Sequence, residues 1–229
     1  MSLISRHSSE YDWKQTGPNR DPDVTILPAG PDATLAAASI IKSGGVIAFK
    51  TDTFYGLGVD PFNGSAVGRL KKIKGRDDGK PILLLISDKI EMSQVILETT
   101  LIFEKASRFF WPGPITLVTR ANPEVPLAIT AGTGTIGIRL PADLTVREFV
   151  RECGGVLTAT SANLAGQPPA RNASEVLDQF DQLIDLVVDG GEVSVAEPST
   201  VLDLTTYPVR LIREGAIRRD AIETVFEVE

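Results

Sequence analysis

The sequence has few of the residues on which many common enzyme mechanisms depend, since its 229 residues include one cysteine and one histidine. The single cysteine, Cys153, excludes an internal disulfide and any cysteine-rich metal site. The single histidine, His7, stands in a polar N-terminal segment, which argues against Ser–His–Asp, Cys–His and histidine-ligated zinc chemistry. Because no histidine can serve as its base, Cys153 is predicted to be a packing residue at a helix end rather than a nucleophile. We therefore expect chemistry carried by Lys, Arg, hydroxyl, carboxylate and backbone groups, with no protein-ligated metal.

Long apolar stretches are also missing. No run approaches the roughly 20 residues that span a bilayer, and the first residues lack the apolar core of a secretory signal. We therefore expect a cytoplasmic protein without membrane contact. Residues 1–23 are polar and contain Pro18 and Pro22, which predicts a flexible N-terminal arm ahead of a single catalytic domain over residues 24–229.

Positive charge is scarce overall but concentrated in one place. The formal net charge of −7 disfavours tight, nonspecific binding to nucleic acid. The segment RLKKIKGRDDGK, residues 69–80, nevertheless contains six basic residues against two aspartates. Such a cluster in an acidic chain is either an anion-binding site or a solvated helix face, and the charge pattern alone leaves both open.

Hydrophobic periodicity predicts an α/β fold, a single domain with a mixed sheet, because several strands follow one another without an intervening helix. Ser65 is the expected N-cap of the helix over 65–74. The apolar segment PILLLIS, residues 81–87, is predicted to be a strand covered on both faces. The expected strands are 24–28, 46–51, 81–87, 115–120, 135–141, 154–163, 183–191, 199–205 and 209–215. The expected helices are 33–45, 65–74, a helical hairpin over about 90–110, 145–153, 173–182 and 218–227.

Two glycine-rich segments have spacings close to those of nucleotide-binding motifs. AGTGTIGIRLP contains Gly132-x-Gly134-x-x-Gly137, but a strand closed by Pro141 follows these glycines where a dinucleotide-binding turn needs a helix. KGRDDGKP is one residue short of P-loop spacing, and proline replaces the hydroxyl residue that would hold magnesium. Neither motif is accepted, so any phosphate must be held by side-chain cations.

Small polar clusters follow several apolar strands. Thr51, Asp52 and Thr53 leave one predicted strand, and Ser161 and Asn163 leave another. Ligands of open α/β sheets bind at the carboxyl ends of strands, although the same residue types are also ordinary turn formers. Several clusters beside a basic segment favour a binding site over turn chemistry alone.

Seven segments in order along residues 30–217 resemble the successive motifs of the YrdC-like family of threonylcarbamoyl-AMP synthases. They are KTDTFYGLG, KKIKGRDDGKPILLLI, FWPGPITLV, TIGIRLP, TSANLAGQP, STVLDL and LIREG. The resemblance implies a twisted mixed parallel and antiparallel sheet with flanking helices around a deep, positively lined cavity, in the short form that lacks an additional C-terminal domain. It also implies that L-threonine, bicarbonate and ATP, with Mg²⁺, give threonylcarbamoyl-AMP and pyrophosphate. A separate downstream transferase complex would then modify tRNA to threonylcarbamoyladenosine.

The resemblance also implies roles for individual residues. The family's Lys-x-Arg and Ser-x-Asn pairs match a catalytic tetrad, Lys74, Arg76, Ser161 and Asn163. Further ATP contacts match Lys80, Thr135 and Arg213. Contacts with L-threonine match Thr51, Thr53, Arg139 and Ser199, where Arg139 would pair with the substrate carboxylate; the alternative for Arg139 is a structural ion pair at the surface. The glycines before Arg139 are expected to let the chain turn tightly and approach a ligand closely.

Two positions depart from the family pattern, and two rival functions remain. Lys50 stands where proline is common, and Leu85 stands where many members have a histidine that touches threonine. One rival is a carbamoyl-adenylate-forming relative, as in hydrogenase-maturation carbamoyltransferases. The other is a noncatalytic RNA-binding protein of the same fold with at most weak tRNA binding, given the negative net charge.

Overall fold

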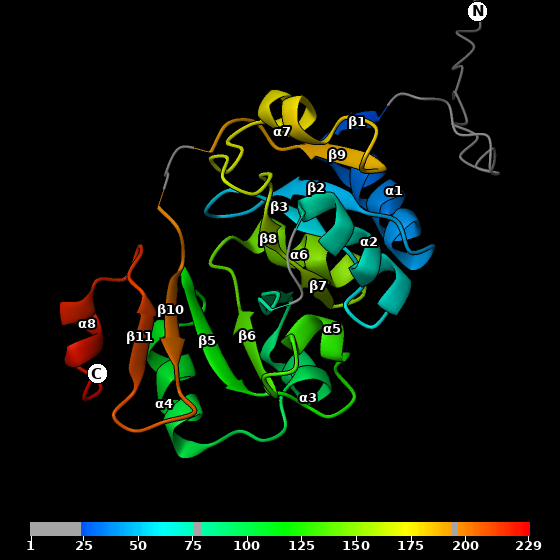
Figure 1. Ribbon diagram of the computed structural model, residues 1–229. Helices are drawn as coiled ribbons and strands as arrows, with labels where there is room; N and C mark the ends of the chain where they lie inside the picture. The colour runs from blue at the N-terminus through cyan, green and yellow to red at the C-terminus, as the bar shows by residue number, and fades with distance from the viewer. Residues whose placement is uncertain (1–23, 76–78, 194–196) are drawn as a thin grey trace, which may run out of the picture.

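Two mixed β-sheets form the framework of the computed structural model, which describes residues 24–75, 79–193 and 197–229 (Figure 1). The first sheet has the order β1-β9-β2-β3-β8. Its strands are β1 (Thr25–Pro28), β9 (Leu186–Asp189), β2 (Ile47–Lys50), β3 (Tyr55–Gly58) and β8 (Thr160–Ser161). Strands β1, β9 and β2 are parallel, whereas β3 is antiparallel to both β2 and β8.

The second sheet has the order β11-β10-β5-β6-β4-β7 and lies in the lower part of Figure 1. Its strands are β11 (Arg210–Arg213), β10 (Thr200–Asp203), β5 (Ile115–Arg120), β6 (Thr135–Arg139), β4 (Leu84–Ile86) and β7 (Val156–Thr158). The pairs β10–β5 and β4–β6 are parallel, and the remaining neighbours are antiparallel. The α/β class with mixed strand pairing is therefore confirmed, but the strands are divided between two sheets.

A single extended segment joins the two sheets. β7 pairs with β4 at the edge of the second sheet, β8 pairs with β3 at the edge of the first, and Ala159 alone separates them. The Ala159 amide donates to the carbonyl of Leu83 at 3.0 Å. The expected strand over 154–163 thus passes from the second sheet to the first at Ala159.

Helices cover the sheets, and their boundaries follow local sequence signals. They are α1 (Pro31–Lys42), α2 (Gly64–Lys74), the 3₁₀ turn η1 (Lys89–Glu91), α3 (Met92–Val95), α4 (Leu101–Phe110), α5 (Leu127–Thr130), α6 (Leu144–Glu152), α7 (Ala173–Phe180) and α8 (Arg219–Glu223). Helix α1 begins with proline, which is preorganised for the first helical position. It buries Ala33, Ala37 and Ile41, which share one face.

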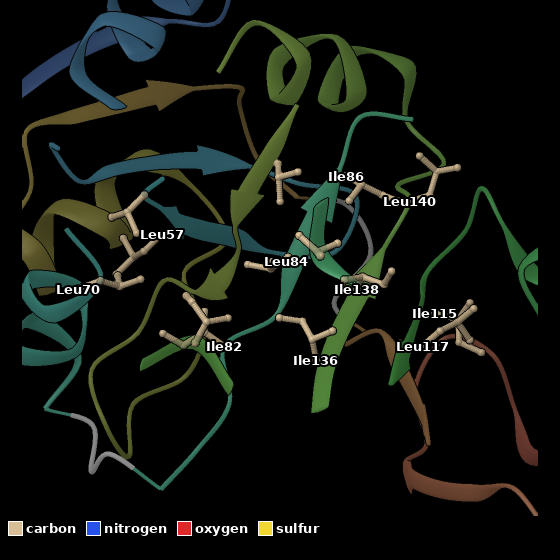
Figure 2. Close-up of a cluster of buried hydrophobic side chains, with 14 of the residues drawn as sticks. Leu57, Leu70, Ile82, Leu84, Ile86, Ile115, Leu117, Ile136, Ile138 and Leu140 are labelled. Carbon is tan, nitrogen blue, oxygen red and sulfur yellow. The ribbon is translucent and has the colours of Figure 1, made fainter. Parts of the chain in front are cut away.

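The largest apolar cluster includes side chains from both sheets. Figure 2 shows a series of these side chains that extends from β3 and α2 across β4 and β6 to β5. Leu84 and Ile86 on β4, and Ile136 and Ile138 on β6, belong to it because alternate residues of a strand share a face. Leu85 instead belongs to a second cluster with α1 and α6, where Phe49 stacks on Phe149 at 5.1 Å between ring centroids.

Two local expectations were wrong. Asn63, not Ser65, caps α2, since its side-chain oxygen accepts the Ala66 amide at 3.1 Å. The helical hairpin expected over 90–110, by contrast, is present as α3 and α4, although the first helix is short, because α3 ends at Val95 and Ile96 forms a β-bridge with Ala121. Helix α8 ends at Glu223, short of the expected 227. The predicted arm, residues 1–23, lies outside the described residues.

Candidate functional site

The turn between β2 and β3 is built by the hydroxyl of Thr51. Thr51 Oγ1 donates to the Phe54 carbonyl at 2.7 Å and accepts the amides of Thr53 at 3.2 Å and Phe54 at 3.3 Å. It also lies 3.2 Å from Thr53 Oγ1. Thr51 therefore holds the turn in place, which leaves Thr53 as the hydroxyl of the turn that faces the second sheet.

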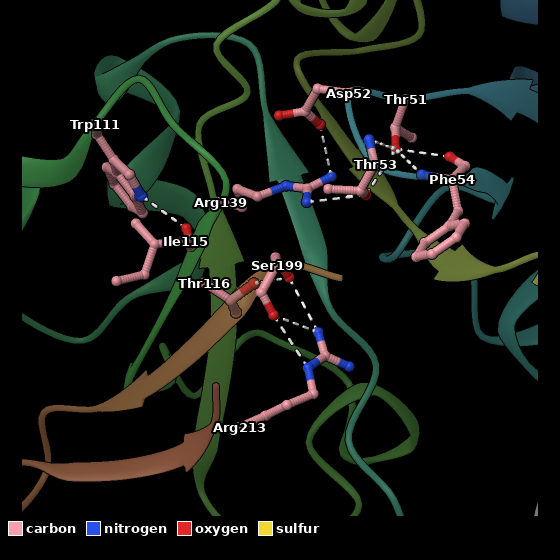
Figure 3. Close-up of polar contacts among 10 residues, drawn as sticks. All are labelled: Thr51, Asp52, Thr53, Phe54, Trp111, Ile115, Thr116, Arg139, Ser199 and Arg213. Carbon is pink, nitrogen blue, oxygen red and sulfur yellow. Dashed lines mark hydrogen bonds and ion pairs between the residues drawn. The ribbon is translucent and has the colours of Figure 1, made fainter. Parts of the chain in front are cut away.

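Arg139, the last residue of β6, joins this turn across the two sheets (Figure 3). Its Nη1 donates to Thr53 Oγ1 at 3.3 Å, and its Nη2 lies 3.0 Å from Asp52 Oδ1. Arg139 is 2% exposed, so the alternative of a surface ion pair is wrong, although an ion pair is present. Among the described residues, both Asp52 oxygens and Arg139 Nε lack a hydrogen-bond partner. The attraction between the two residues is therefore ionic rather than a well-aligned hydrogen bond.

Burial governs the electrostatics of Arg139. Desolvation lowers the pKa of the Arg139 guanidinium, the Asp52 carboxylate opposes this effect, and the nearby positive charge of Arg213 lowers the pKa further. Arginine nevertheless stays protonated in proteins at neutral pH. Leu85 is the register partner of Arg139 on β4 and is fully buried. The departure at Leu85 thus gives Arg139 an apolar neighbour that cannot hydrogen-bond a ligand.

Ser199 lies immediately before β10 and connects two strands of the second sheet (Figure 3). Its hydroxyl lies 3.1 Å from the Oγ1 of Thr116 on β5 and accepts from Arg213 Nη2 at 3.1 Å. Nε and Nη2 of Arg213 also donate to the Ser199 carbonyl, at 3.0 and 2.8 Å. Although much of Arg213 is exposed, its guanidinium end lies against the protein, and this partial burial lowers its pKa.

Lys74, at the last position of α2, contacts the turn that follows β8. Its Nζ donates to the carbonyls of Ser161 at 2.5 Å and Asn163 at 2.6 Å, and lies 3.3 Å from Asn163 Oδ1. Ser161 Oγ donates to the same Oδ1 at 2.6 Å. The structure therefore brings three members of the predicted tetrad together. The fourth, Arg76, lies outside the described residues.

The other predicted ATP contacts are more dispersed. Lys80 is exposed. Thr135 begins β6, so it lies at the opposite end of the strand from Arg139, and its hydroxyl is 2.9 Å from that of Thr133. Thr135, Gly137 and Arg139 share one face of β6. A Cβ atom at Gly137 would meet Thr116 Cγ2 at 3.0 Å, so glycine leaves room for the Thr116 side chain on this face.

The basic segment after Ser65 is not a uniformly solvated helix face. Arg69 pairs with Asp185 at 2.5 Å, and Lys71 and Lys74 are buried, whereas Lys72 is exposed. The helix ends because Gly75 adopts a left-handed conformation, with φ of 55°. The described residues therefore argue against a wholly solvated helix face, and the alternative of an anion-binding site stays a prediction.

Metal ligands are not grouped in the part of the chain that the structure describes, where no three His, Cys, Asp or Glu residues are placed to hold an ion. No helix among those residues is long and apolar enough to cross a membrane. Two surface hollows lie elsewhere, one beside η1 and α3 and one beside Thr119 and Tyr207. The deep cavity implied by the sequence remains a prediction.

Several structurally important residues received no role from the sequence. Asp52 was noted at a strand end, but its pairing with Arg139 required tertiary structure. Lys50, a departure from the family pattern, donates to the carbonyls of Gly190 and Glu192, both at 3.0 Å. The sequence signal for Lys50 was a cation directly after an apolar strand. Its hydrogen-bond partners, however, lie about 140 residues away along the chain.

Comparison with known proteins identifies the family. Residues 39–215 match the Sua5/YciO/YrdC family model, whose description is "Telomere recombination". A threonylcarbamoyl-AMP synthase of Pyrococcus abyssi is 35% identical over 189 residues, which are 82% of this chain and 56% of that protein. One from Idiomarina loihiensis is 36% identical over 174 residues, which are 75% of this chain and 93% of that protein.

A solved structure agrees with these matches. The crystal structure of Pyrococcus abyssi Sua5 complexed with L-threonine has a TM-score of 0.83 and 31% identity, over 90% of this chain and 62% of that one. The present chain thus spans little more than half of the length of the Pyrococcus relative. On the extent of the family match and the identity to these relatives, the chain belongs to the Sua5/YciO/YrdC family.

Proposed function

We propose that the protein is an L-threonylcarbamoyl-adenylate synthase, which converts L-threonine, bicarbonate and ATP into threonylcarbamoyl-AMP and pyrophosphate. The observation that carries the proposal is the meeting of Lys74, Ser161 and Asn163 at one turn. The names of the relatives and the threonine bound to Pyrococcus abyssi Sua5 support the choice of substrate. The product would be used by a separate complex that modifies tRNA.

The proposed reaction first forms a carbon–nitrogen bond and then transfers a nucleotidyl group. The threonine amine and bicarbonate give an N-carboxylate and water. An oxygen of this carboxylate then attacks the α-phosphorus of ATP, and the bond to the pyrophosphate leaving group breaks. Two anions must approach each other, so the main requirement is neutralisation of charge and alignment. Cations and hydroxyls suffice for this, in a chain whose one histidine, His7, lies outside the described residues.

Among the described residues, Lys74 is a cation well placed to act on phosphate oxygens. Its ammonium group has three donors, and it contacts Ser161 O, Asn163 O and Asn163 Oδ1. An incoming phosphate oxygen would replace the longest contact, that with Asn163 Oδ1. ATP would arrive as its magnesium complex, with the ion held by phosphates and water, which suits a site where the described residues supply cations and hydroxyls rather than clustered carboxylates.

The second group of site residues would hold the amino acid. The Arg139 guanidinium would receive the substrate carboxylate beside Thr53, and Ser199 would add a hydroxyl. Thr135 and Arg213 would contact ATP. In this arrangement the face of β6 between Thr135 and Arg139 would lie along the two substrates.

The test is pyrophosphate release by the purified protein with ATP, Mg²⁺, bicarbonate and L-threonine, together with detection of threonylcarbamoyl-AMP by mass spectrometry. Release should require all of these components. Serine lacks one methyl group and should react with a kcat/KM about 10- to 150-fold lower, the discrimination typical of one methyl group. Release that is independent of threonine, or no release at all, would overturn the proposal.

A further inference from the structure

The ion pair between Asp52 and Arg139 is unusually poor in hydrogen bonds. The side chains are 12% and 2% exposed, and the charged groups lie 3.0 Å apart. A carboxylate offers about four acceptor sites and a guanidinium five donors. Within the described part of the chain, neither Asp52 oxygen has a hydrogen-bond partner, and the guanidinium hydrogen-bonds to Thr53 while its Nε has no partner.

Other aspartate–arginine pairs of the protein differ from this one. Asp203 pairs with Arg210 and also accepts from the amide of Thr205 at 2.9 Å and from its hydroxyl at 2.6 Å. Asp185 pairs with Arg69 and also accepts the Val46 amide at 2.8 Å. These two carboxylates are fixed by backbone donors, as structural carboxylates commonly are. Asp52 has no such donor among the described residues, so its oxygens have acceptor sites to which a bound ligand can donate.

We propose that Asp52 is a specificity-determining residue that binds the α-ammonium group of the amino-acid substrate while Arg139 binds its carboxylate. This inference rests on the proposed function, since that function supplies the amino acid. An α-amino acid carries its two opposite charges on neighbouring groups, and the protein presents two opposite charges side by side. When the substrate ammonium group lies at Asp52 and its carboxylate lies at Arg139, the four charged groups form a ring in which positive and negative charges alternate.

The charge balance of the site favours this arrangement. Without a substrate, Asp52 and Arg139 neutralise each other, so neither is left as an uncompensated buried charge. A zwitterion adds no net charge and supplies the hydrogen bonds that both groups lack. A substrate analogue with a carboxylate but no ammonium group would instead place a second negative charge beside Asp52, which is unfavourable. The site should therefore select amino acids over the corresponding carboxylic acids that lack the α-amino group.

The test compares L-threonine with 3-hydroxybutyrate, which is threonine without its amino group, by calorimetric titration of the full-length protein without ATP. Wild-type protein should prefer threonine by at least about tenfold. D52N should weaken threonine binding by about 10- to 100-fold, the range of a hydrogen bond between charged groups. The same substitution should leave 3-hydroxybutyrate binding unchanged or tighter. D203N is the matched control, since it neutralises a buried, arginine-paired aspartate at the far end of β10 from Ser199, and it should alter neither affinity.

A role that is only structural would give a different result. If Asp52 merely positions Arg139, D52N will weaken both ligands equally, and the inference is overturned. The pH dependence of wild-type binding gives a test that needs no variant: threonine affinity should fall as the substrate ammonium group loses its proton, and constant affinity would contradict the inference.

The result also separates this inference from the proposed function. Selective threonine binding without pyrophosphate release would support the role of Asp52 and contradict the proposed synthase activity. Threonine-dependent pyrophosphate release by the wild type, together with equal losses of affinity for threonine and 3-hydroxybutyrate in D52N, would support the synthase activity and contradict the role of Asp52.

Discussion

The ammonium group of Lys74 holds the main chain at Ser161, with Nζ 2.5 Å from the Ser161 carbonyl oxygen. The two residues belong to different elements, the end of α2 and the end of β8, and lie 87 positions apart in the sequence. Nζ also donates to the Asn163 carbonyl at 2.6 Å. Lys74 thus has a structural contact with the turn in addition to its proposed contact with phosphate.

Replacement of Lys74 by methionine should therefore affect both activity and stability. K74M removes the ammonium donor, so pyrophosphate release should fall by about 100- to 1,000-fold, as when one donor to the transition state is lost. The free energy of unfolding should fall by about 2 kcal/mol, because the carbonyls of the turn lose a charged donor. Initial rates and urea denaturation measure the two effects. K72M alters an exposed lysine of the same helical turn and should change neither; a K74M protein with the wild-type rate would contradict the assignment.

Replacement of Ser199 by alanine should raise KM for threonine and lower the free energy of unfolding by about 1 kcal/mol, because the buried Thr116 hydroxyl loses its partner. The substitution removes a hydroxyl next to Thr116 and Arg213, but Arg213 keeps both hydrogen bonds to the Ser199 carbonyl. The rise in KM should be about 3- to 10-fold, the value of one hydrogen bond. Steady-state kinetics with threonine as the varied substrate measure it. A fall in kcat at constant KM would instead place Ser199 in the chemical step.

Replacement of Tyr55 by phenylalanine should destabilise the protein. The buried Tyr55 hydroxyl accepts the Gly190 amide at 3.0 Å and donates to the Gly191 carbonyl at 2.9 Å. Y55F leaves these groups without that partner, so the free energy of unfolding at pH 7 should fall by about 1–2 kcal/mol in urea denaturation. Y207F is the control because Tyr207 is 64% exposed, and it should unfold like the wild type.

The effect of Tyr55 should also depend on pH. Burial, as the main cause, raises the pKa of Tyr55 from 10.0 to about 12. A raised pKa means that the stabilisation is fully present below pH 10 and is lost as the pH rises toward 12. The difference in stability between wild type and Y55F should therefore be constant from pH 6 to 9 and shrink above pH 10. A difference that grows above pH 10 would show that the ionised phenol is stabilised by folding.

The sequence predicted those features that short stretches of chain determine. PILLLIS was expected to be a strand covered on both faces, and Leu84–Ile86 are fully buried. Cys153 was expected to be a packing residue at a helix end, and it is buried at the C-cap of α6, where burial raises its pKa to about 12. The signal for the strand is a local run of apolar residues, and the signal for Cys153 is its place at a helix end together with the lack of a histidine that could serve as its base.

Features that depend on distant segments could not be predicted in the same way. Ser65 and Asn63 are both acceptable N-caps, and only the structure shows that the helix begins after Asn63, whose side chain accepts the Ala66 amide. The hairpin expected over 90–110 is present, but the short length of its first helix follows from the pairing of Ile96 with Ala121, a contact that no helical periodicity records. The ion pair of Asp52 with Arg139 likewise needs both sheets in place.

The glycine-rich segment before β6 allows a prediction with opposite signs at two positions. Ala131 follows α5 with φ of 51°, and Gly134 has φ of 69°. A left-handed conformation costs an L-residue about 1–2 kcal/mol relative to glycine, and part of this is offset by the greater flexibility of glycine in the unfolded chain. A131G should therefore raise the free energy of unfolding by about 0.5 kcal/mol. G134A should lower it by about 1 kcal/mol through backbone strain alone, since a Cβ atom there meets nothing within 4 Å. Urea denaturation of both variants decides the matter, and a loss of stability in A131G would mean that the Ala131 methyl group makes a packing contribution larger than the strain it relieves.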